Sequence, residues 1–338
     1  MTAHSQQPTP QLAFETMTAY QRSEALKAAI EIELFTAIGE GRHTAAQIAE
    51  RCNASERGTT ILCDFLAMIG FLTKDGSTYS LTQDSAVFLD QRSPAYLGGA
   101  VEFLMSDQIT EGFKHLSAAV RKGGTVIPQD GTLAPEHPVW IKFGKAMAPM
   151  MRPVAATIAQ MIDPEANRPI KVLDIAASHG LFGLAFATRN PQAKVVGVDW
   201  GSVLELSKEN AKIAGVADRH SIIAGSAFDV DYGSDYDVVL LTNFLHHFDP
   251  PTNEKLLRKV HAALKDGGRA VTLEFVPNDD RITPPGVAGF GLVMLAGTPS
   301  GNAYTFKEFD QMFKNAGFSK NAIHDAPPAI EQLIVSEK

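Results

Sequence analysis

The stretch that decides the fold reads Lys171-Val-Leu-Asp174-Ile-Ala176-Ala-Ser178-His-Gly180-Leu-Phe-Gly183. An apolar run, typical of a buried strand, leads into a turn of small residues that opens a helix. A second apolar run, Val195-Val-Gly-Val-Asp199, ends in a carboxylate. This layout is typical of a Rossmann-like nucleotide cradle, where small residues let the backbone approach the ligand closely.

Two acidic residues indicate which cofactor this cradle binds. Asp199 lies 19 residues after Gly180, where a carboxylate can bind both hydroxyls of a ribose. Asp174 ends the first strand, and only two of the three fingerprint glycines are present, as Gly180 and Gly183. A cofactor with an ammonium group and no pyrophosphate suits Asp174 better than a nicotinamide dinucleotide does. The cradle therefore predicts S-adenosylmethionine.

Composition limits the class of protein and its partners. The 338 residues suffice for two ordinary domains, and the net charge of −8 argues against a nucleic-acid partner. No apolar run reaches the ~18 residues of a membrane span, and the polar N-terminus does not resemble a signal peptide. Two cysteines cannot form a disulfide framework. We expect a cytoplasmic protein without membrane contact.

The N-terminal part, residues 11–100, has a mostly helical pattern. Residues 25–38 are apolar on more than one face, which predicts a helix that is deeply buried or shared with another subunit. Thr44 begins a capping box, Ser55 can cap a further helix, and Asp75-Gly76 predicts a hairpin. Helices followed by a hairpin predict a winged-helix fold. The segment from 44 to 82 carries fewer basic than acidic residues, so we expect a packing role rather than DNA binding.

A second helical segment, residues 101–165, carries an apolar stripe. Its members recur at steps of three and four: Trp140, Phe143, Met147, Met150 and Val154. They fit core packing or, because methionine and aromatic side chains suit flat apolar ligands, the wall of a substrate pocket. Pro149 and Pro153 should kink or restart this helix. We expect residues 276–301, with Phe290 and Met294, to form a loop and helix over the same pocket.

From residue 166 to 338, strands and helices alternate, which predicts a parallel sheet covered on both faces. The predicted strands lie near 170–175, 194–199, 219–223, 236–242 and 269–275, and a helix near 305–316 follows. The last two strands, near 319–324 and 330–335, are joined by a link too short for a crossover helix, so they should be antiparallel. This pattern predicts the seven-stranded class I methyltransferase sheet.

With these motifs, the chain resembles the two-domain small-molecule O-methyltransferases that carry an N-terminal winged-helix dimerisation domain, over residues 12–336. The matching runs are Val172-Leu-Asp174-Ile, Val198-Asp199, Ala224-Gly-Ser226-Ala-Phe228, Leu245-His246-His-Phe-Asp249 and Thr272-Leu-Glu274. The resemblance implies a homodimer with intertwined N-terminal helices, S-adenosylmethionine as donor, and an apolar pocket between the two domains. The predicted cofactor-binding residues are Asp174, Ala176, Ser178, Gly180, Asp199, Trp200, Ser226, Ala227, Phe228 and Asn243.

The chain departs from the pattern of that family at several positions. Ala176-Ala177-Ser178 stands in place of the family's Gly-Gly-Gly, and Ser226 replaces an aspartate in the loop that flanks adenine. His247 and Phe248 replace the Asp-Trp pair that follows the family's catalytic histidine, and Ala303 stands where plant members have a second acid.

Two residues carry the predicted chemistry. His246 follows the fourth strand, Glu274 ends the fifth, and in such sheets ligands bind at the carboxyl ends of the strands. A histidine suits proton removal from a hydroxyl at neutral pH, and an acid beside it can orient it. The alternative is that His246 only caps the next helix or satisfies polar groups in the core. We expect His247 to point away from His246, and His179 to contact the cofactor or to sit in an exposed turn.

The combined prediction is a dimeric S-adenosylmethionine-dependent O-methyltransferase acting on a small, mostly apolar, hydroxylated molecule. The sequence does not decide whether the atom that accepts the methyl group is oxygen, nitrogen, sulfur or carbon. A second possibility is an enzyme of the same fold that performs decarboxylation, hydroxylation or rearrangement, and a third is a winged-helix regulator. No cluster has the spacing of a metal site.

Overall fold

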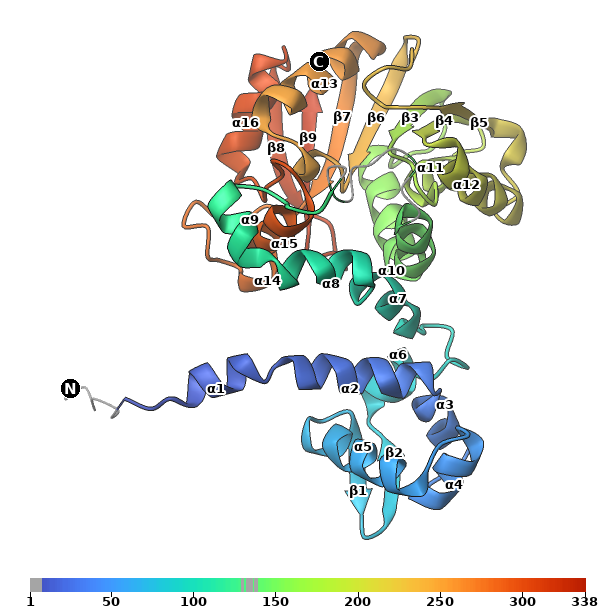
Figure 1. The fold of residues 1–338 in the computed structure, drawn as a ribbon. Coiled ribbons are helices and arrows are strands. Elements are labelled where there is room, and N and C mark those ends of the chain that lie inside the picture. Colours follow the sequence, from blue (N-terminus) through green and yellow to red (C-terminus); the bar gives the residue numbers. More distant parts are fainter. Residues whose placement is uncertain (1–7, 129–130, 132–135, 137–138) are drawn as a thin grey trace, which may run out of the picture. The chain divides into compact units, whose positions relative to one another are not determined.

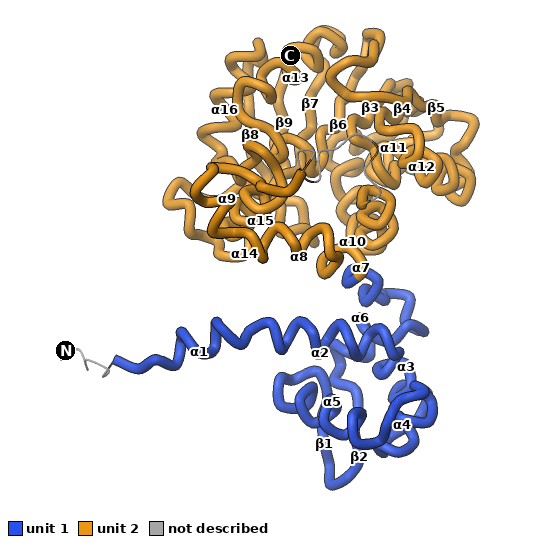
Figure 2. The backbone as a smooth tube through the Cα atoms, in the orientation of Figure 1, with its two compact units in different colours: residues 1–101 blue, residues 102–338 orange. Residues whose placement is uncertain are grey.

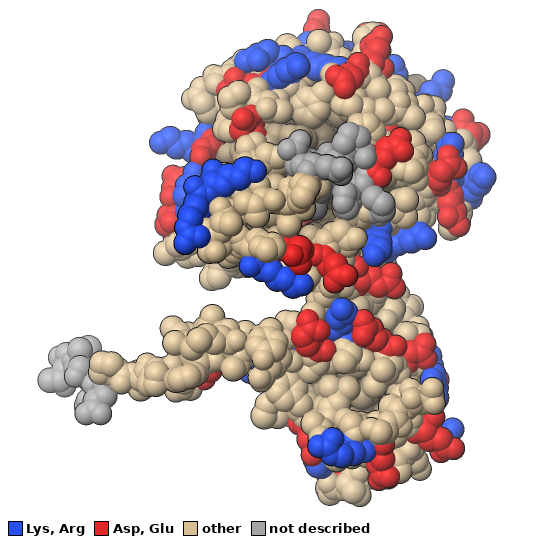
Figure 3. Space-filling model, viewed as in Figure 1, with Lys and Arg blue, Asp and Glu red and all other residues tan. Residues whose placement is uncertain are grey.

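The computed structural model describes residues 8–128, 131, 136 and 139–338. It divides into two compact units, residues 1–101 and residues 102–338 (Figure 2). The three domain ranges given above stay predictions. On the face shown in Figure 3, lysine and arginine side chains are interspersed with aspartate and glutamate, in keeping with the modest net charge of −8.

The first unit is a winged helix (Figure 1). Its elements are α1 (Gln11–Met17), α2 (Tyr20–Glu31), α3 (Leu34–Gly39), α4 (Ala45–Arg51), α5 (Glu56–Met68), β1 (Leu72–Asp75), β2 (Thr78–Leu81), α6 (Gln83–Phe88) and the 3₁₀ turn η1 (Gly98–Ala100). The capping box at Thr44 and the cap at Ser55 are confirmed. The predicted hairpin is confirmed as well, with β1 and β2 antiparallel.

The predicted helix over residues 25–38 was wrong, because the chain breaks there into two helices. Helix α2 ends at Glu31, and Glu33 adopts a left-handed conformation with φ of 59° before α3 begins. The break redirects the chain, so that Leu34, Phe35 and Ile38 of α3 are buried in the core of the first unit. Apolar residues that seemed to cover several faces of one helix thus belong to two helices, each with its own buried face.

The second unit contains the remaining elements. Its helices are α7 (Val101–Leu104), α8 (Asp107–Lys114), α9 (Leu116–Lys122), α10 (Val139–Ile162), α11 (Leu181–Arg189), α12 (Gly201–Ile213), α13 (Pro250–Ala263), α14 (Pro285–Ala288), α15 (Phe290–Gly297) and α16 (Phe306–Asn315), with 3₁₀ turns η3 (Ala217–Arg219) and η4 (Leu245–His247). Its strands are β3 (Ile170–Ile175), β4 (Ala193–Asp199), β5 (His220–Ala224), β6 (Tyr236–Thr242), β7 (Leu264–Glu274), β8 (Lys320–Asp325) and β9 (Gln332–Glu337).

The predicted seven-stranded sheet is confirmed. Its order is β5-β4-β3-β6-β7-β9-β8. The first five of these strands are parallel to one another, whereas β9 runs antiparallel to both β7 and β8. Because β3 lies between β4 and β6, the chain reverses its direction of winding at β3. Open sheets bind their ligands at such a switch point, beyond the carboxyl ends of the strands.

Helices cover both faces of this sheet, and alternate strand residues supply the two cores. Val172 of β3 packs in the core under α10, α11 and α12, whereas Leu173 packs in the core under α13 and α16. Such burial of apolar surface on both sides stabilises the sheet that carries the site. Among the described residues, the structure contains no helix both long and apolar enough to cross a lipid bilayer.

Of the two outcomes predicted for Pro149 and Pro153, a kink or a restart, the restart does not occur. The helix runs without interruption through Pro149 and Pro153. Each proline leaves one carbonyl of the preceding turn without its helical donor. Both prolines are exposed, so water can satisfy these carbonyls, while Val154 and Ile158 on the opposite side hold the helix against the sheet.

Candidate functional site

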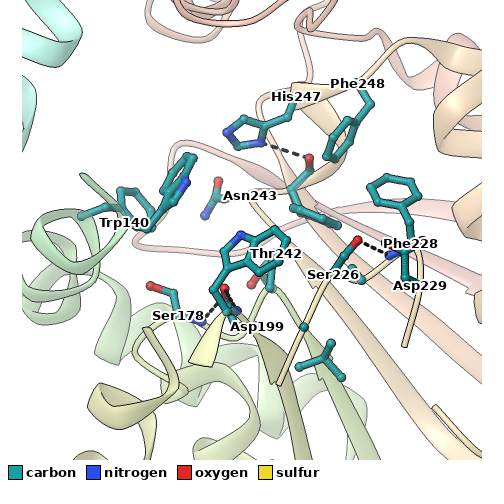
Figure 4. A pocket seen from close by; sticks show the side chains of 17 residues that line it. Trp140, Ser178, Asp199, Ser226, Phe228, Asp229, Thr242, Asn243, His247 and Phe248 are labelled. Atoms are coloured by element: carbon teal, nitrogen blue, oxygen red, sulfur yellow. Dashed lines mark hydrogen bonds between the residues drawn. The ribbon is translucent and has the colours of Figure 1, made fainter. Parts of the chain in front are cut away.

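A pocket of about 360 Å³ opens at the edge of the sheet where the parallel strands end (Figure 4). Ten of the predicted site residues line it: Trp140, Phe143, Ala176, Ser178, Asp199, Trp200, Ser226, Ala227, Phe228 and Asn243. Sequence reasoning did not predict the other lining residues, which are Val198, Gly225, Asp229, Thr242, Phe244, His247 and Phe248.

One wall of the pocket is the turn between β3 and α11, which is held in an unusual backbone conformation. Ala176, Ser178 and Gly180 have φ values of 55°, 49° and 73°. Only the glycine adopts such a conformation without steric cost, and for the other two the cost is on the order of 1 kcal/mol each. The turn brings the Ser178 N–H within 2.8 Å of Asp199 Oδ2. Strain of this kind persists where the surroundings hold it, as they do at binding sites.

Asp174 lies below this turn and is almost fully buried. Its Oδ2 accepts a hydrogen bond from the Gly183 N–H at 2.9 Å, whereas its Oδ1 is buried without any partner among the described residues. A side chain at Gly183 would collide with Val195 and approach Asp174 Oδ2, so this glycine is needed for the close contact. Burial, together with the charge of the nearby Asp199, raises the pKa of Asp174 to about 7. The carboxylate therefore requires a cation, a proton or a hydrogen-bond donor.

Asp174 should make the stability of the ligand-free protein depend on pH. The folded protein holds a proton at Asp174 up to about pH 7, whereas an unfolded aspartate loses it near pH 4. Protonated Asp174 thus contributes to the free energy of unfolding. This contribution is complete below about pH 4 and is lost as pH rises through about 7. Asp174→Asn, which cannot ionise, should therefore gain on the order of 2–3 kcal/mol over the parent between pH 5 and pH 8, measured by urea denaturation. The exposed Asp266→Asn is the control, and a pH-independent difference for Asp174→Asn would contradict the assignment.

Polar atoms line the pocket on either side of the switch point. Asp199, at the end of β4, accepts hydrogen bonds from the N–H groups of Ser178 and Trp200 at 2.8 and 2.7 Å, one on each carboxylate oxygen. Each oxygen keeps a second lone pair for a ligand. The Oγ of Ser178 and the Oδ1 of Asn243 are buried with no partner among the described residues. Burial raises the pKa of Asp199, because the charged form loses hydration.

Aromatic rings form the apolar walls. Phe248 lies edge-on to both Phe228 and Phe244, with ring centroids 5.0 and 5.1 Å apart. On the opposite side, Trp140 and Phe143 of α10 are 5.8 Å apart. Walls of this kind suit flat, apolar ligands such as a purine or an aromatic ring.

The turn after β6 carries His246, and this histidine contacts Glu274 at the end of β7; both are predicted catalytic residues. His246 Nδ1 lies 2.6 Å from Glu274 Oε2, and both side chains are buried. The other oxygen of Glu274 accepts hydrogen bonds from the N–H groups of Phe244, Leu245 and His246, at 3.0, 2.7 and 3.3 Å. These donors stabilise a carboxylate that would otherwise be costly to bury. They also fix the backbone of the turn that carries both histidines.

The structure places several other predicted residues outside the lining of this pocket. Met150 is 38% exposed on α10, Met147 packs against the core below α10, and Met294 is buried in α15. Phe290 contacts the catalytic turn instead, because its ring lies 4.8 Å from that of His246. Asp174 and Gly180 lie behind the lining, and His246 is also absent from it.

The expectation for His247 was wrong, and one of the two alternatives for His179 is excluded. His247 does not point away from His246, because η4 is a tight 3₁₀ turn that brings their ring centroids to 4.2 Å. His179 is not exposed: it is buried, and its Nδ1 accepts a hydrogen bond from the Leu181 N–H. Burial lowers the pKa of His179 to about 4, and the charge of Arg152 contributes. Within the described residues, no group of His, Cys, Asp and Glu could hold a metal ion.

Comparisons with known proteins agree with this geometry. A family model described as the O-methyltransferase domain matches residues 113–319, and one described as the O-methyltransferase dimerisation domain matches residues 14–91. A crystal structure of a candidate O-methyltransferase from Nostoc punctiforme is 57% identical, with a TM-score of 0.95 over 98% of this chain and 100% of that one.

Two further relatives cover almost the whole chain. The 3-hydroxy-5-methyl-1-naphthoate 3-O-methyltransferase of Streptomyces sahachiroi is 27% identical, over 97% of this chain and 95% of its own length. PigF of Serratia, described as an S-adenosyl-L-methionine-dependent methyl transferase, is 25% identical over 98% of this chain and 96% of its own length. The structure of PigF with SAH superposes with a TM-score of 0.85, over 98% of this chain and 100% of that one.

Proposed function

Since this chain belongs to the O-methyltransferase family, whose members methylate small molecules with S-adenosylmethionine, we propose that it methylates a hydroxyl group of a small, flat, mostly apolar molecule. The observation that carries the proposal is the buried pair of His246 and Glu274 beside a pocket with aromatic walls. The naphthoate specificity of the Streptomyces relative supports an aromatic acceptor.

The residues around the pocket fit the cofactor. Asp199 would bind the two ribose hydroxyls, and the loop from Ser226 to Phe228 would flank the adenine. Asp174, whose Oδ1 has no partner among the described residues, would compensate the positive charge of the ammonium group. Ser178 Oγ and Asn243 Oδ1 offer two further unused polar atoms. When bound, S-adenosylmethionine supplies a methyl group on a sulfonium, which an oxygen nucleophile can attack directly.

The proton of the acceptor hydroxyl would pass to His246. Its Nδ1 faces Glu274, so Nε2 is the nitrogen that remains to accept this proton. Glu274 then stabilises the positive charge that develops on the imidazole, while its three backbone hydrogen bonds keep it in place. The stacked rings of Phe275 and Phe290, beside His246, keep the surroundings of the reacting oxygen apolar.

The test is a turnover assay with purified protein, S-adenosylmethionine and a panel of aromatic alcohols. The expected result is one S-adenosylhomocysteine for each methylated product. A product that lacks the methyl group, with S-adenosylmethionine unconsumed, would instead indicate the alternative chemistry in which the cofactor only stabilises charge.

We also propose that the first unit forms a homodimer, as the match to the dimerisation model suggests. Helix α1 buries none of its residues, and Leu12, Phe14 and Met17 are each more than 60% exposed. An apolar surface of this kind on a soluble protein indicates an interface.

Light scattering at micromolar concentration should report a dimer, and Phe14→Asp should shift it toward monomer. Ile213→Asp, which changes an exposed apolar residue on α12, should leave the dimer intact; a monomeric parent would contradict the proposal.

A further inference from the structure

His247 is a polar side chain in an otherwise aromatic part of the pocket wall. It lines the pocket but is only 7% exposed (Figure 4). Its ring lies 5.4 Å from that of Trp140 and 6.4 Å from that of Phe244. In the pattern of the family that this chain resembles, an aspartate stands at this position.

The hydrogen bonding of His247 determines which of its nitrogens can bind a ligand. Its Nδ1 lies 3.1 Å from the carbonyl oxygen of Phe244, which can only accept, so Nδ1 carries the proton. The imidazole is neutral, because burial, together with the charge of His246, lowers the pKa of His247 well below its usual range. Nε2 therefore presents a lone pair and acts as an acceptor.

This acceptor has no donor within the described part of the chain, where the hydrogen bond from Nδ1 to the Phe244 carbonyl is the one that the His247 side chain makes. If a bound molecule sealed this acceptor from water without offering a donor, the loss would cost about 1–3 kcal/mol. A bound molecule with a suitably placed donor would remove that cost, whereas one with another acceptor at that place would be repelled.

The position of His247 indicates which bound molecule would donate a hydrogen bond to its Nε2. Its ring lies 4.2 Å from that of His246, so a group bonded to His247 lies close to the oxygen that loses its proton to His246. Resting on the proposed function, we propose that His247 Nε2 accepts a hydrogen bond from a second hydroxyl group, adjacent to the one that is methylated. The preferred acceptors are ortho-dihydroxy aromatic compounds. Aromatic hydroxy acids with a carboxylate at that place are disfavoured, since two acceptors would face each other.

Three probes on one scaffold test this assignment: 2,3-dihydroxynaphthalene, 2-naphthol and 3-hydroxy-2-naphthoate. The parent enzyme should favour the diol over 2-naphthol by about tenfold in kcat/KM, the value of one hydrogen bond, and should disfavour the acid. His247→Leu should reduce this preference to less than about twofold. His247→Gln, which restores an acceptor, should recover part of it. The affinity for S-adenosylhomocysteine, measured by calorimetry, should stay the same in all three proteins.

A binding measurement separates this inference from the proposed function. With S-adenosylhomocysteine bound, calorimetry should show the same diol preference in the parent and its loss in His247→Leu. A preserved binding preference without methylation of any probe would contradict the proposed function and still support the role of His247. Equal binding and turnover of diol and 2-naphthol by the parent would overturn the inference. So would a His247→Leu variant that keeps the preference, or one that loses about tenfold in affinity for S-adenosylhomocysteine.

Discussion

Replacing His246 with alanine should lower the rate of methyl transfer by roughly 10²–10⁴-fold, while the affinity for S-adenosylmethionine stays nearly unchanged. The imidazole does not line the pocket that would hold the cofactor, so its loss should remove proton transfer and leave cofactor binding intact. Glu274 keeps its three backbone donors in the variant, which should preserve the turn after β6. Steady-state kinetics and calorimetry on the same preparations measure the two effects.

A second variant separates proton transfer from a purely structural role. His246→Gln keeps a hydrogen-bonding side chain but offers no base, so its rate should fall about as far as that of His246→Ala. His324→Ala, which removes an exposed histidine from the edge strand β8, is the matched control and should keep parental activity. His247→Leu should lose far less activity than His246→Ala. An alanine variant at 246 with most of its activity would mean that alignment of the two reactants suffices, and that the acceptor is already acidic, a thiol or an amine.

Replacing Asp199 with alanine should weaken the binding of S-adenosylmethionine by about 2–3 kcal/mol, or roughly 30–150-fold in Kd. The carboxylate would lose its contact with the ribose. In addition, the Ser178 and Trp200 N–H groups would lose the acceptor that joins the turn after β3 to the end of β4. Calorimetric titration with S-adenosylmethionine measures the loss.

Two variants set the scale of that measurement. Asp199→Asn keeps one acceptor oxygen and should fall between alanine and the parent. Asp218→Ala, which removes an exposed carboxylate from the short η3 turn, should bind as the parent does. Parental affinity in Asp199→Ala would refute the assignment of this residue to the ribose.

The sequence by itself determined those features that depend on neighbours along the chain. The capping box at Thr44 and the hairpin at Asp75-Gly76 follow from hydrogen bonds and turn geometry within a few residues. The alternation of apolar strands and helices predicted the parallel sheet, because each such segment must bury its own apolar side. The strand ends then predicted that Asp199, His246 and Glu274 would lie along one edge, since parallel strands end on the same side.

Tertiary structure decided what depends on contacts between distant segments. The break at Glu33 and the unbroken course of α10 reflect packing against the rest of each unit, which outweighs local preference. Glu274 binds three backbone N–H groups nearly thirty residues away, and the resulting turn places His247 beside His246 and in the pocket wall. The period of a pattern shows which side of an element is buried. The direction of a side chain in a tight turn is set by partners that only the folded chain brings together.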